Sequence, residues 1–592
     1  MCQGKIRVCY HVCMGFSIQA IFIILFLIEG LGIVQNHSIL FYLYLIASPL
    51  LVAAMIRNKK RFVFPPIISS LFFVFLIIVL FSAFHFSVDK QISFEYWLLY
   101  ANMFLLFIYW YNNKEEGKIL TGRMIRIGTV VFFLAYVVKT LFLKNSLINV
   151  FPKNEFNLFS SYASLNHNHL GDFIGLAIIM IVWNYFVFNK KQFVAFILFI
   201  GVVLYSFSRS AYVSLFFTFL FILWRNRGRV KEFKKHIIAA LIFFLLFFGM
   251  SLLLGRGLKT GYGKKFTLAN VIQVPYKNIF GGRIGFFSQA LQSSRERPLF
   301  GLGPGNFIYA SVKYRQDYFS TAGTSFNLFL DILVGNGIFA FLAFFSIVFL
   351  ITRSAFKKTS LFSVFFLYML LNFQTNYIYQ IYGVLFLFVI SGAVTYEEKN
   401  EAPHTIMYAI LSLFLFILSA LIIASKLFLL HGQAEIARQL YPLNKEAYYQ
   451  LIQNAFKEKD YDSAHKWINQ YFQISPDDTG ALLSFGDLYN THKQSSQALT
   501  YYERAYKIDH FIPFPEIEKM YLIKKEVSSL QKASVFIENI FVYYKSLFTP
   551  WQIHNYYKDT IVAFCKKTKE KACIKEGFLK SLPVPKTLKA VN

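Results

Sequence analysis

Three polar segments interrupt an otherwise apolar chain and carry residue types that could hold an anionic substrate. Residues 161–173 read SYASLNHNHLGDF, residues 207–212 read FSRSAY, and residues 281–307 read GGRIGFFSQALQSSRERPLFGLGPGNF. Arginine side chains and exposed backbone N–H groups are the groups that bind phosphate. Arg209 and Arg283 are therefore candidate ligands of a substrate that carries phosphate.

The third segment combines a short helix with a glycine-rich turn. Pro298 ends a predicted helix whose apolar face is formed by Ile284, Phe287, Ala290 and Leu291. The glycines that follow allow a tight turn with exposed N–H groups: Gly301, Gly303 and Gly305. No GKS or GKT follows, so the segment is not a nucleotide P-loop, and a re-entrant turn without a ligand is the alternative. We interpret it as a site for an anionic lipid head group, such as a diphosphate.

Arg209 stands between two apolar runs, where an unpaired charge is costly. It is either a functional group or an interfacial anchor that contacts lipid phosphate. Asp172, beside His167 and His169, is a candidate partner for Arg209. The HNH sequence brings no carboxylate or cysteine set with metal-ligand spacing, which disfavours a metal site. An ordinary polar helix start is the alternative interpretation of these histidines.

Membrane helices must position these segments. The chain has 592 residues, 56% of them hydrophobic, and a mean hydropathy of +0.47. Apolar runs of about 20 residues are long enough to cross the hydrocarbon core of a bilayer. About 13 such runs are expected to span it, near residues 14–34, 39–56, 67–84, 94–112, 125–144, 169–188, 192–207, 210–224, 237–254, 323–351, 360–374, 378–395 and 405–427. The first is expected to be retained, because no small-residue cleavage site is clear.

The net charge of +29 could suit nucleic-acid binding. Much of the basic charge, however, lies in short loops between apolar runs, such as 57–62 and 225–236. A polytopic protein marks its cytoplasmic side in this way, which disfavours nucleic acid as a partner. With the N-terminus inside, the three polar segments and everything after residue 427 fall outside the cytoplasm. Long loops escape the charge rule, so the basic residues of 255–322 do not conflict with this topology.

A polar, helix-forming tail begins after about residue 430 and repeats itself. Pro442 and Pro476 are 34 residues apart, and alanines follow the same period: Ala447 and Ala481, Ala464 and Ala498. This period is typical of tetratricopeptide repeats, and an irregular helical tail is the alternative. The predicted fold class is all-α, a polytopic membrane helix bundle followed by a soluble tetratricopeptide-like domain. The expected divisions are 1–160 and 351–428 for flanking spans, 161–350 for the core with its loop 255–322, and 429–592 for the repeats.

The polar segments resemble motifs of a known family, the O-antigen ligases and related polysaccharide polymerases. The SRSA-type motif that opens a span is matched by Ser208, Arg209, Ser210 and Ala211. The loop motif is matched by Arg283, Phe287, Ala290, Pro298, Gly301, Gly303, Gly305 and Phe307. An earlier Asn-containing motif is matched by Asn166, Asn168 and Gly171. Residues 324–345 resemble a span that usually begins with His-Asn, and tetratricopeptide tails recur in the family.

One position departs from the family pattern. Phe326 precedes Asn327 where the ligases usually carry a histidine, which is thought to help activate the acceptor hydroxyl as a general base. A phenylalanine cannot take that role. Either His167 or His169 supplies the base, or this branch works without it, or the chain is not a true ligase.

The resemblance implies a glycosyltransferase that moves a glycan from a polyprenyl-diphosphate carrier to an acceptor hydroxyl, on the outer face of the bacterial cytoplasmic membrane. Arg209 and Arg283 would stabilise the diphosphate, and His167 would act in catalysis, without a cofactor or metal. The expected substrate-binding residues are Asn166, Asn168, His169, Ser208, Gly303, Gly305 and Asn327. The acceptor would be a glycan, a lipid or a protein. The spans would contact membrane lipid, and the repeat domain would recruit an acceptor or an envelope protein.

A transporter and an envelope-assembly scaffold are the competing functions. A transporter predicts charged or broken spans near the middle of the membrane and two related halves. Few charges lie within the spans, and they show no obvious internal symmetry. A scaffold would bind partners through the tail and would tolerate the loss of Arg209 and Arg283.

Overall fold

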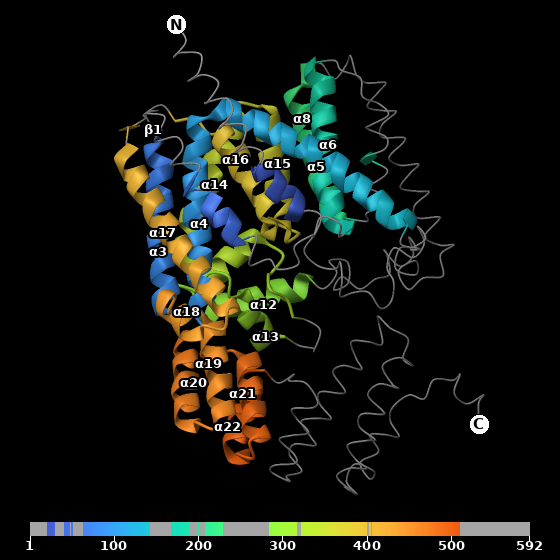
Figure 1. Cartoon of the computed structure of the whole chain (residues 1–592). Coiled ribbons are helices and arrows are strands. Elements are labelled where there is room, and N and C mark those ends of the chain that lie inside the picture. The colour runs from blue at the N-terminus through green and yellow to red at the C-terminus, as the bar shows by residue number, and fades with distance from the viewer. Residues whose placement is uncertain are drawn as a thin grey trace, which may run out of the picture.

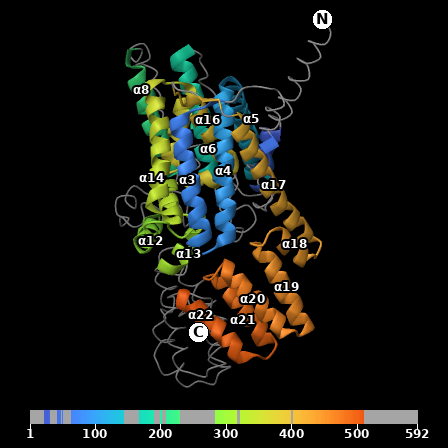
Figure 2. The same cartoon turned by 90° about the vertical axis from the view of Figure 1, so that its left-hand side faces the viewer.

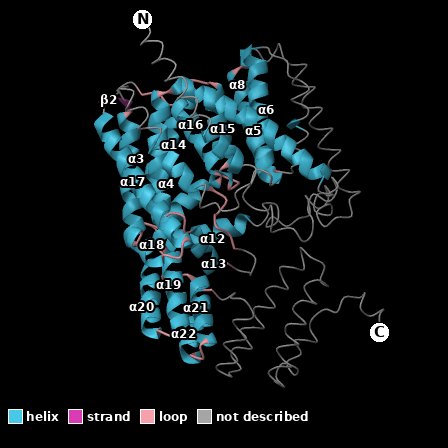
Figure 3. Ribbon diagram, in the orientation of Figure 1, coloured by secondary structure: helices cyan, strands magenta, loops and turns pink. Residues whose placement is uncertain are grey.

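The computed structural model describes a helical protein with one short two-stranded pairing (Figure 3). The described residues are 21–29, 41–47, 49–50, 63–142, 167–188, 199–200, 208–228, 283–315, 321–398, 402–403 and 405–509. Most of the span expected at 192–207, the whole of 237–254 and the tail beyond 509 lie outside them.

Helices that are mostly apolar form a bundle, which α5 crosses obliquely (Figures 1 and 2). They are α3 (Pro66–His85), α4 (Lys90–Asn112), α5 (Lys114–Phe142), α6 (His167–Phe188), α8 (Arg209–Arg225), α14 (Leu328–Lys357), α15 (Leu361–Asn372), the 3-10 turn η2 (Ile378–Gln380), α16 (Tyr382–Thr395) and α17 (Thr405–Leu430). Segments 21–29 and 41–47 are also helical.

The bundle has the character of a membrane protein. Within the described residues, four helices are long and apolar enough to cross a membrane by length and composition: α3, α4, α14 and Ile406–Leu430 of α17. Shorter apolar helices cover His169–Tyr185, Ser210–Arg225, Leu361–Asn372 and Tyr382–Thr395. The predicted class, an all-α polytopic membrane protein, is confirmed. The total number of spans stays a prediction, because part of the chain lies outside the described residues.

The loops separate into two groups at opposite ends of the bundle. At the first, which we call the basic end, β1 (Val63–Phe64) pairs antiparallel with β2 (Ala402–Pro403). Here Lys114 Nζ donates to the Tyr396 carbonyl at 2.6 Å, and Lys358 pairs with Glu397 at 2.6 Å. These contacts join loops that the charge pattern assigns to the same side.

The opposite end, which we call the loop end, contains α12 (Arg283–Glu296), α13 (Phe307–Tyr314) and the turn between them (Figure 1). The turn packs on α14 where that helix is kinked at Gly337, whose φ is 73°. A Cβ at Gly337 would lie 2.1 Å from the Leu299 carbonyl oxygen, so only glycine allows this approach. The Ile338 N–H donates to the Pro298 carbonyl at 2.8 Å, which ties the turn to the kink.

Polar side chains set where the helices at the loop end begin. Asp89 accepts from the Ile92 N–H at 3.1 Å, Ser208 from Ala211 at 3.3 Å, and Asn327 from Leu330 at 3.0 Å. Each satisfies one of the backbone donors that the first turn of a helix leaves without an intrahelical partner. The same polar side chains that define the helix starts therefore also gather at this end.

Beyond α17 the chain continues as helical hairpins next to α13 (Figures 1 and 2). These helices are α18 (Ala434–Leu440), α19 (Lys445–Glu458), α20 (Tyr461–Ile474), α21 (Thr479–Thr491) and α22 (Ser495–Ile508). The starts of α19 and α20 recur 34 residues later in α21 and α22. Ala464 and Ala498 are fully buried where the paired helices meet. The assignment of these hairpins to the tetratricopeptide class and the expected domain limits stay predictions.

Candidate active site at the loop end

Arg283 lies against the residue that replaces the usual histidine of the resembled family. Its guanidinium carbon is 5.6 Å from the centre of the Phe326 ring. Phe286, one turn along α12, stacks on the same ring, with 5.2 Å between the two ring centres. Phe326 in turn contacts Tyr377 edge-on at 5.0 Å, and Tyr377 contacts His169 edge-on at 4.8 Å. A continuous series of contacts thus joins α12, the start of α14, the loop after α15 and the start of α6.

A tight turn before α14 holds the Phe326 ring in this position. Phe326 has a φ of 63°, a left-handed conformation that is uncommon for a bulky residue. Its N–H donates to the Thr324 hydroxyl at 3.1 Å, and the Ser325 N–H donates to Asp331 Oδ1 at 2.7 Å. The conformation costs about 1–3 kcal/mol, and such cost is typical of functional sites. The turn therefore presents the side chain at position 326 to α12.

Asp172 is the centre of a polar cluster next to the contact series that runs from Arg283 to His169. The side chain is 2% exposed, and Oδ1 accepts from the Ser208 hydroxyl at 2.8 Å and the Ser210 hydroxyl at 2.9 Å. The Asn376 amide donates to Oδ2. Asp172, Tyr368 and Asn372 line a small cavity together with apolar side chains. Ser208 and Ser210 flank Arg209, so the carboxylate of α6 fixes the backbone on both sides of that arginine.

The glycine-rich turn is closely packed against neighbouring helices. A Cβ at Gly303 would lie 2.3 Å from Ser93 Oγ, and one at Gly305 would lie 2.4 Å from the Tyr96 ring. Gly303 is buried, as are its neighbours Leu302 and Pro304. The close approach of this backbone to α4 and α14 explains the glycines. This packing holds the turn between α12 and α13 in place, and the phosphate-binding role expected of Gly303 and Gly305 stays a prediction.

The remaining predicted site residues fall into three groups. Ser208 and Asn327 cap α8 and α14, and the Asn327 amide also donates to the Gln374 carbonyl at 3.1 Å. Arg209 is the first residue of α8, and His167 and Asn168 lie in the first turn of α6, but their side chains are outside the described set. Asn166 is outside the described residues. The expected Asp172–Arg209 pair therefore stays a prediction, whereas the contacts of Asp172 with the two flanking serines are present.

Two contributors were not identified from the sequence alone. Asn376 and Tyr377 belong to a loop of three residues expected between spans, and they contact Asp172, Phe326 and His169. Their polar types between two strongly apolar runs were the available signal. In the described residues, no group of three or more His, Cys, Asp or Glu side chains could hold a metal ion.

One family model matches part of the chain. Residues 194–345 match the family model described as O-antigen ligase, a stretch of about a quarter of the chain. The match contains Arg209, Arg283 and Phe326, whereas His169 and Asn376 lie outside it. Searches of curated proteins and of solved structures returned no match. The predicted resemblance to the O-antigen ligase family is thus confirmed for residues 194–345.

Proposed function

We propose that this protein transfers a glycan from a polyprenyl-diphosphate carrier to an acceptor hydroxyl, on the outer face of the bacterial cytoplasmic membrane. The observation that carries the proposal is the contact series from Arg283 through Phe326 and Tyr377 to His169. It places a cation, the position where the family usually has histidine, and a histidine from another helix at one end of the bundle. This is the set of groups that a diphosphate leaving group and an acceptor hydroxyl require.

The reaction is a substitution at the anomeric carbon of the carried glycan. The acceptor oxygen forms a bond to that carbon while the bond from carbon to the diphosphate oxygen breaks. The leaving polyprenyl diphosphate takes the bonding electron pair, and the hydroxyl proton passes to a base. Arg283 and Arg209 stabilise the negative charge that grows on the diphosphate, so the mechanism needs no metal ion and no cofactor.

Histidine from α6 is the proposed base. The contact of His169 with Tyr377 supports it, because Tyr377 also touches Phe326. His167, two residues earlier in the first turn of the same helix, is the second candidate. A histidine contributed by α6 would explain how Phe326 is tolerated, since the base would come from a neighbouring helix.

Several expected roles become indirect under this proposal. Ser208 and Asn327 hold helix starts, and Gly303 and Gly305 hold the turn that carries α12. Asn166 and Asn168 remain proposed glycan ligands beside His167. The acceptor is a glycan, a lipid or a protein, and the C-terminal hairpins recruit it or an envelope partner.

The decisive test compares two arginines of α12. Membranes containing wild type, Arg283→Ala or Arg295→Ala at matched protein level are given a polyprenyl-diphosphate-linked glycan, and its consumption is followed. Arg295 lies at the far end of the same helix and is exposed, so its replacement controls for the loss of one positive charge. We expect Arg283→Ala to lose about a hundredfold or more in turnover and Arg295→Ala to retain it.

The size of the product separates polymerisation from a single transfer. Equal turnover by the two variants, or no turnover by wild type with several lipid-linked donors, would count against glycan transfer and favour a transporter or a scaffold.

A further inference from the structure

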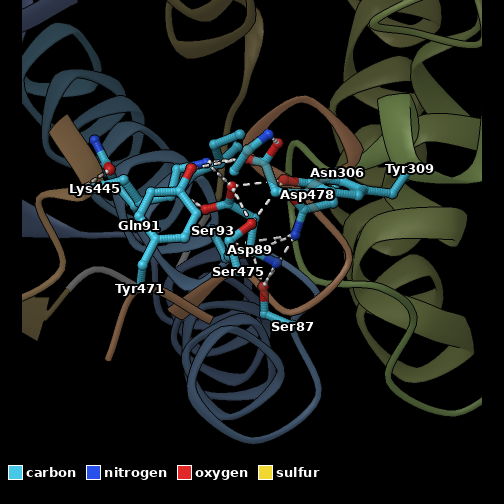
Figure 4. Close-up of polar contacts among 12 residues, drawn as sticks. Ser87, Asp89, Gln91, Ser93, Asn306, Tyr309, Lys445, Tyr471, Ser475 and Asp478 are labelled. Atoms are coloured by element: carbon cyan, nitrogen blue, oxygen red, sulfur yellow. Dashed lines mark hydrogen bonds and ion pairs between the residues drawn. The ribbon is translucent and has the colours of Figure 1, made fainter. Parts of the chain in front are cut away.

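A single buried carboxylate joins three distant parts of the chain at the loop end (Figure 4). Asp89 precedes α4 and is fully buried. Its Oδ2 atom accepts from the Tyr309 hydroxyl of α13 at 2.8 Å and from the Ser475 hydroxyl at 3.1 Å, and it pairs with the Lys445 ammonium. We call Asp89, Tyr309, Lys445, Ser475 and Asp478 the junction. The membrane bundle, the loop and the C-terminal hairpins meet in it.

The charges of the junction are arranged to hold Lys445 in place. Lys445 Nζ is also 3.3 Å from Asp478 Oδ2, and the Tyr471 hydroxyl donates to that same oxygen at 2.8 Å. Burial lowers the pKa of Lys445, but the charges of Asp89 and Asp478 outweigh this effect and raise the pKa above its usual value. The ammonium group therefore stays charged. In addition, the backbone N–H of Lys445 donates to the Gln91 side-chain oxygen at 2.9 Å.

A second contact fixes the other end of α13. Arg315, which follows this helix, makes a two-point ion pair with Asp509, which follows α22. Both side chains are less than a tenth exposed. The Arg315 Nε–H group donates to Asp509 Oδ1 at 3.0 Å. Because Tyr309 also contacts Ser475 at 2.9 Å, the C-terminal hairpins hold α13 near its start and after its end.

The position of α13 is transmitted to α12. The buried Ser311 hydroxyl donates to the Gln289 side chain of α12 at 2.9 Å. Asn306, at the start of α13, donates to the Ser87 hydroxyl at 3.0 Å and the Ser93 hydroxyl at 2.9 Å, next to Asp89. Arg283 begins α12. A short path of hydrogen bonds thus runs from the C-terminal hairpins to the helix that carries Arg283.

We propose that the C-terminal hairpins are a positioning part of the active site, which hold Arg283 in place through Lys445 and Asp509. This inference rests on the proposed function of Arg283. It assigns the hairpins a role inside the enzyme that is separate from the recruitment of a partner. Lys445, Asp509, Tyr309 and Arg315 are then positioning residues, because they act on the reaction through α13 and α12 and do not touch the substrate.

The test uses the full-length protein in membranes, with Lys445→Met and Asp509→Asn as separate variants. Lys457→Met, an exposed lysine of the same helix α19, is the matched control. Donor turnover is measured at equal protein level, and hydrogen exchange is followed for the amides of residues 302–315. We expect Lys445→Met and Asp509→Asn each to lose about tenfold in turnover and to exchange faster over 302–315, whereas Lys457→Met matches wild type.

A second background separates positioning from general damage. In the Arg283→Lys background, Lys445→Met should lower turnover by much less than it does in wild type, because both changes act on the same group. Unchanged turnover and exchange in Lys445→Met and Asp509→Asn would overturn the inference, as would an undiminished effect of Lys445→Met in the Arg283→Lys background. If Arg283→Ala itself keeps full turnover, the proposed function fails, and the exchange data alone then decide whether the hairpins hold α13.

Discussion

Asp89 and Asp172 are both buried carboxylates at the loop end, but they are held in different ways. Asp172, at 2% exposure, accepts from two serines and one asparagine, all of them neutral. Asp89, at zero exposure, accepts from hydroxyl groups and also pairs with Lys445. Asp172 joins helices of the bundle to one another, whereas Asp89 joins the bundle to the hairpins that follow it.

The difference follows from the cost of burying charge. Removing a carboxylate from water costs on the order of several kcal/mol, so the buried group needs several hydrogen-bond donors or a counterion. Between membrane helices, short hydroxyl and amide side chains supply the donors without bringing a second charge into the bundle. At the junction, Lys445 comes from a polar domain and can bring its charge with it. The Asp172 group is therefore suited to holding membrane helices against one another. The Asp89 group is suited to holding the C-terminal hairpins against the bundle.

The largest effect should come from removing the charge partner at the junction. Asp89→Ala takes the cap from α4 and a buried acceptor from Lys445, so we expect a loss of about 3–5 kcal/mol in stability. Thermal unfolding in detergent or nanodiscs measures it. Lys445→Met combined with Asp89→Asn should cost less than the sum of the two single changes. Additive losses would mean that the two residues do not act as a pair.

Asp172→Asn tests the neutral cluster. The carboxylate accepts from Ser208 and Ser210 at one oxygen and from Asn376 at the other, and asparagine keeps only one of these two acceptors. The cluster that holds the start of α8 around Arg209 is therefore left with an unsatisfied donor. We expect donor turnover to fall on the order of a hundredfold with the protein still present in the membrane. Asp462→Asn, an exposed position of α20, is the control. Full activity of Asp172→Asn would remove Asp172 from the positioning role given to it here.

Gly303→Ala tests whether the turn beside the junction is held by packing. The added methyl group would lie 2.3 Å from Ser93 Oγ on a backbone whose φ is +89°, so we expect a loss of about 1–3 kcal/mol in stability. Gly285→Ala in α12 meets no atom within 4 Å and should be neutral or slightly stabilising. Thermal midpoints of the two variants give the comparison, and equal midpoints would contradict it.

The smallest effect is expected at the exposed ion pair of Glu296 on α12 and Lys313 on α13. Their Oε2 and Nζ atoms are 2.5 Å apart. Lys313 lowers the pKa of Glu296, so the pair stabilises the protein above the usual carboxyl pKa and loses this contribution as the pH falls through the lowered pKa. Both side chains are about half exposed, which limits the contribution to less than about 0.5 kcal/mol. Glu296→Gln should leave the thermal midpoint at pH 7 almost unchanged, and a shift as large as that of Gly303→Ala would show that the pair is more than a surface contact.

Much of the architecture could be predicted because it depends on local periodicity. Runs of apolar residues predict the ends of α3 and α17 within three residues and those of α14 within six, and the 34-residue period predicts the paired starts of α19 and α21. Basic loops such as the one containing Lys114 lie together at one end, in agreement with the charge pattern. These features depend on hydrophobicity and charge, which the sequence displays directly.

The candidate site was only partly predictable. The sequence identified Arg209 and Arg283 and the departure at Phe326 by motif resemblance. It did not reveal that Tyr377 bridges Phe326 and His169, because these contacts join segments far apart in the chain. The sequence also did not reveal the close packing at Gly303, since glycine spacing is the same for a ligand-binding turn and for a closely packed one.

The sequence by itself determined the membrane-embedded helical class, the polar segments that carry the candidate chemistry and the start of the repeating tail. Each of these depends on residue type and local spacing. Only the tertiary structure decided which partners the buried carboxylates take. Asp172 lies with the serines that flank Arg209, and Asp89 lies with Lys445, 356 residues away in sequence. Such partners are selected by the packing of whole helices, because a buried charge is tolerated only where the fold brings donors to it.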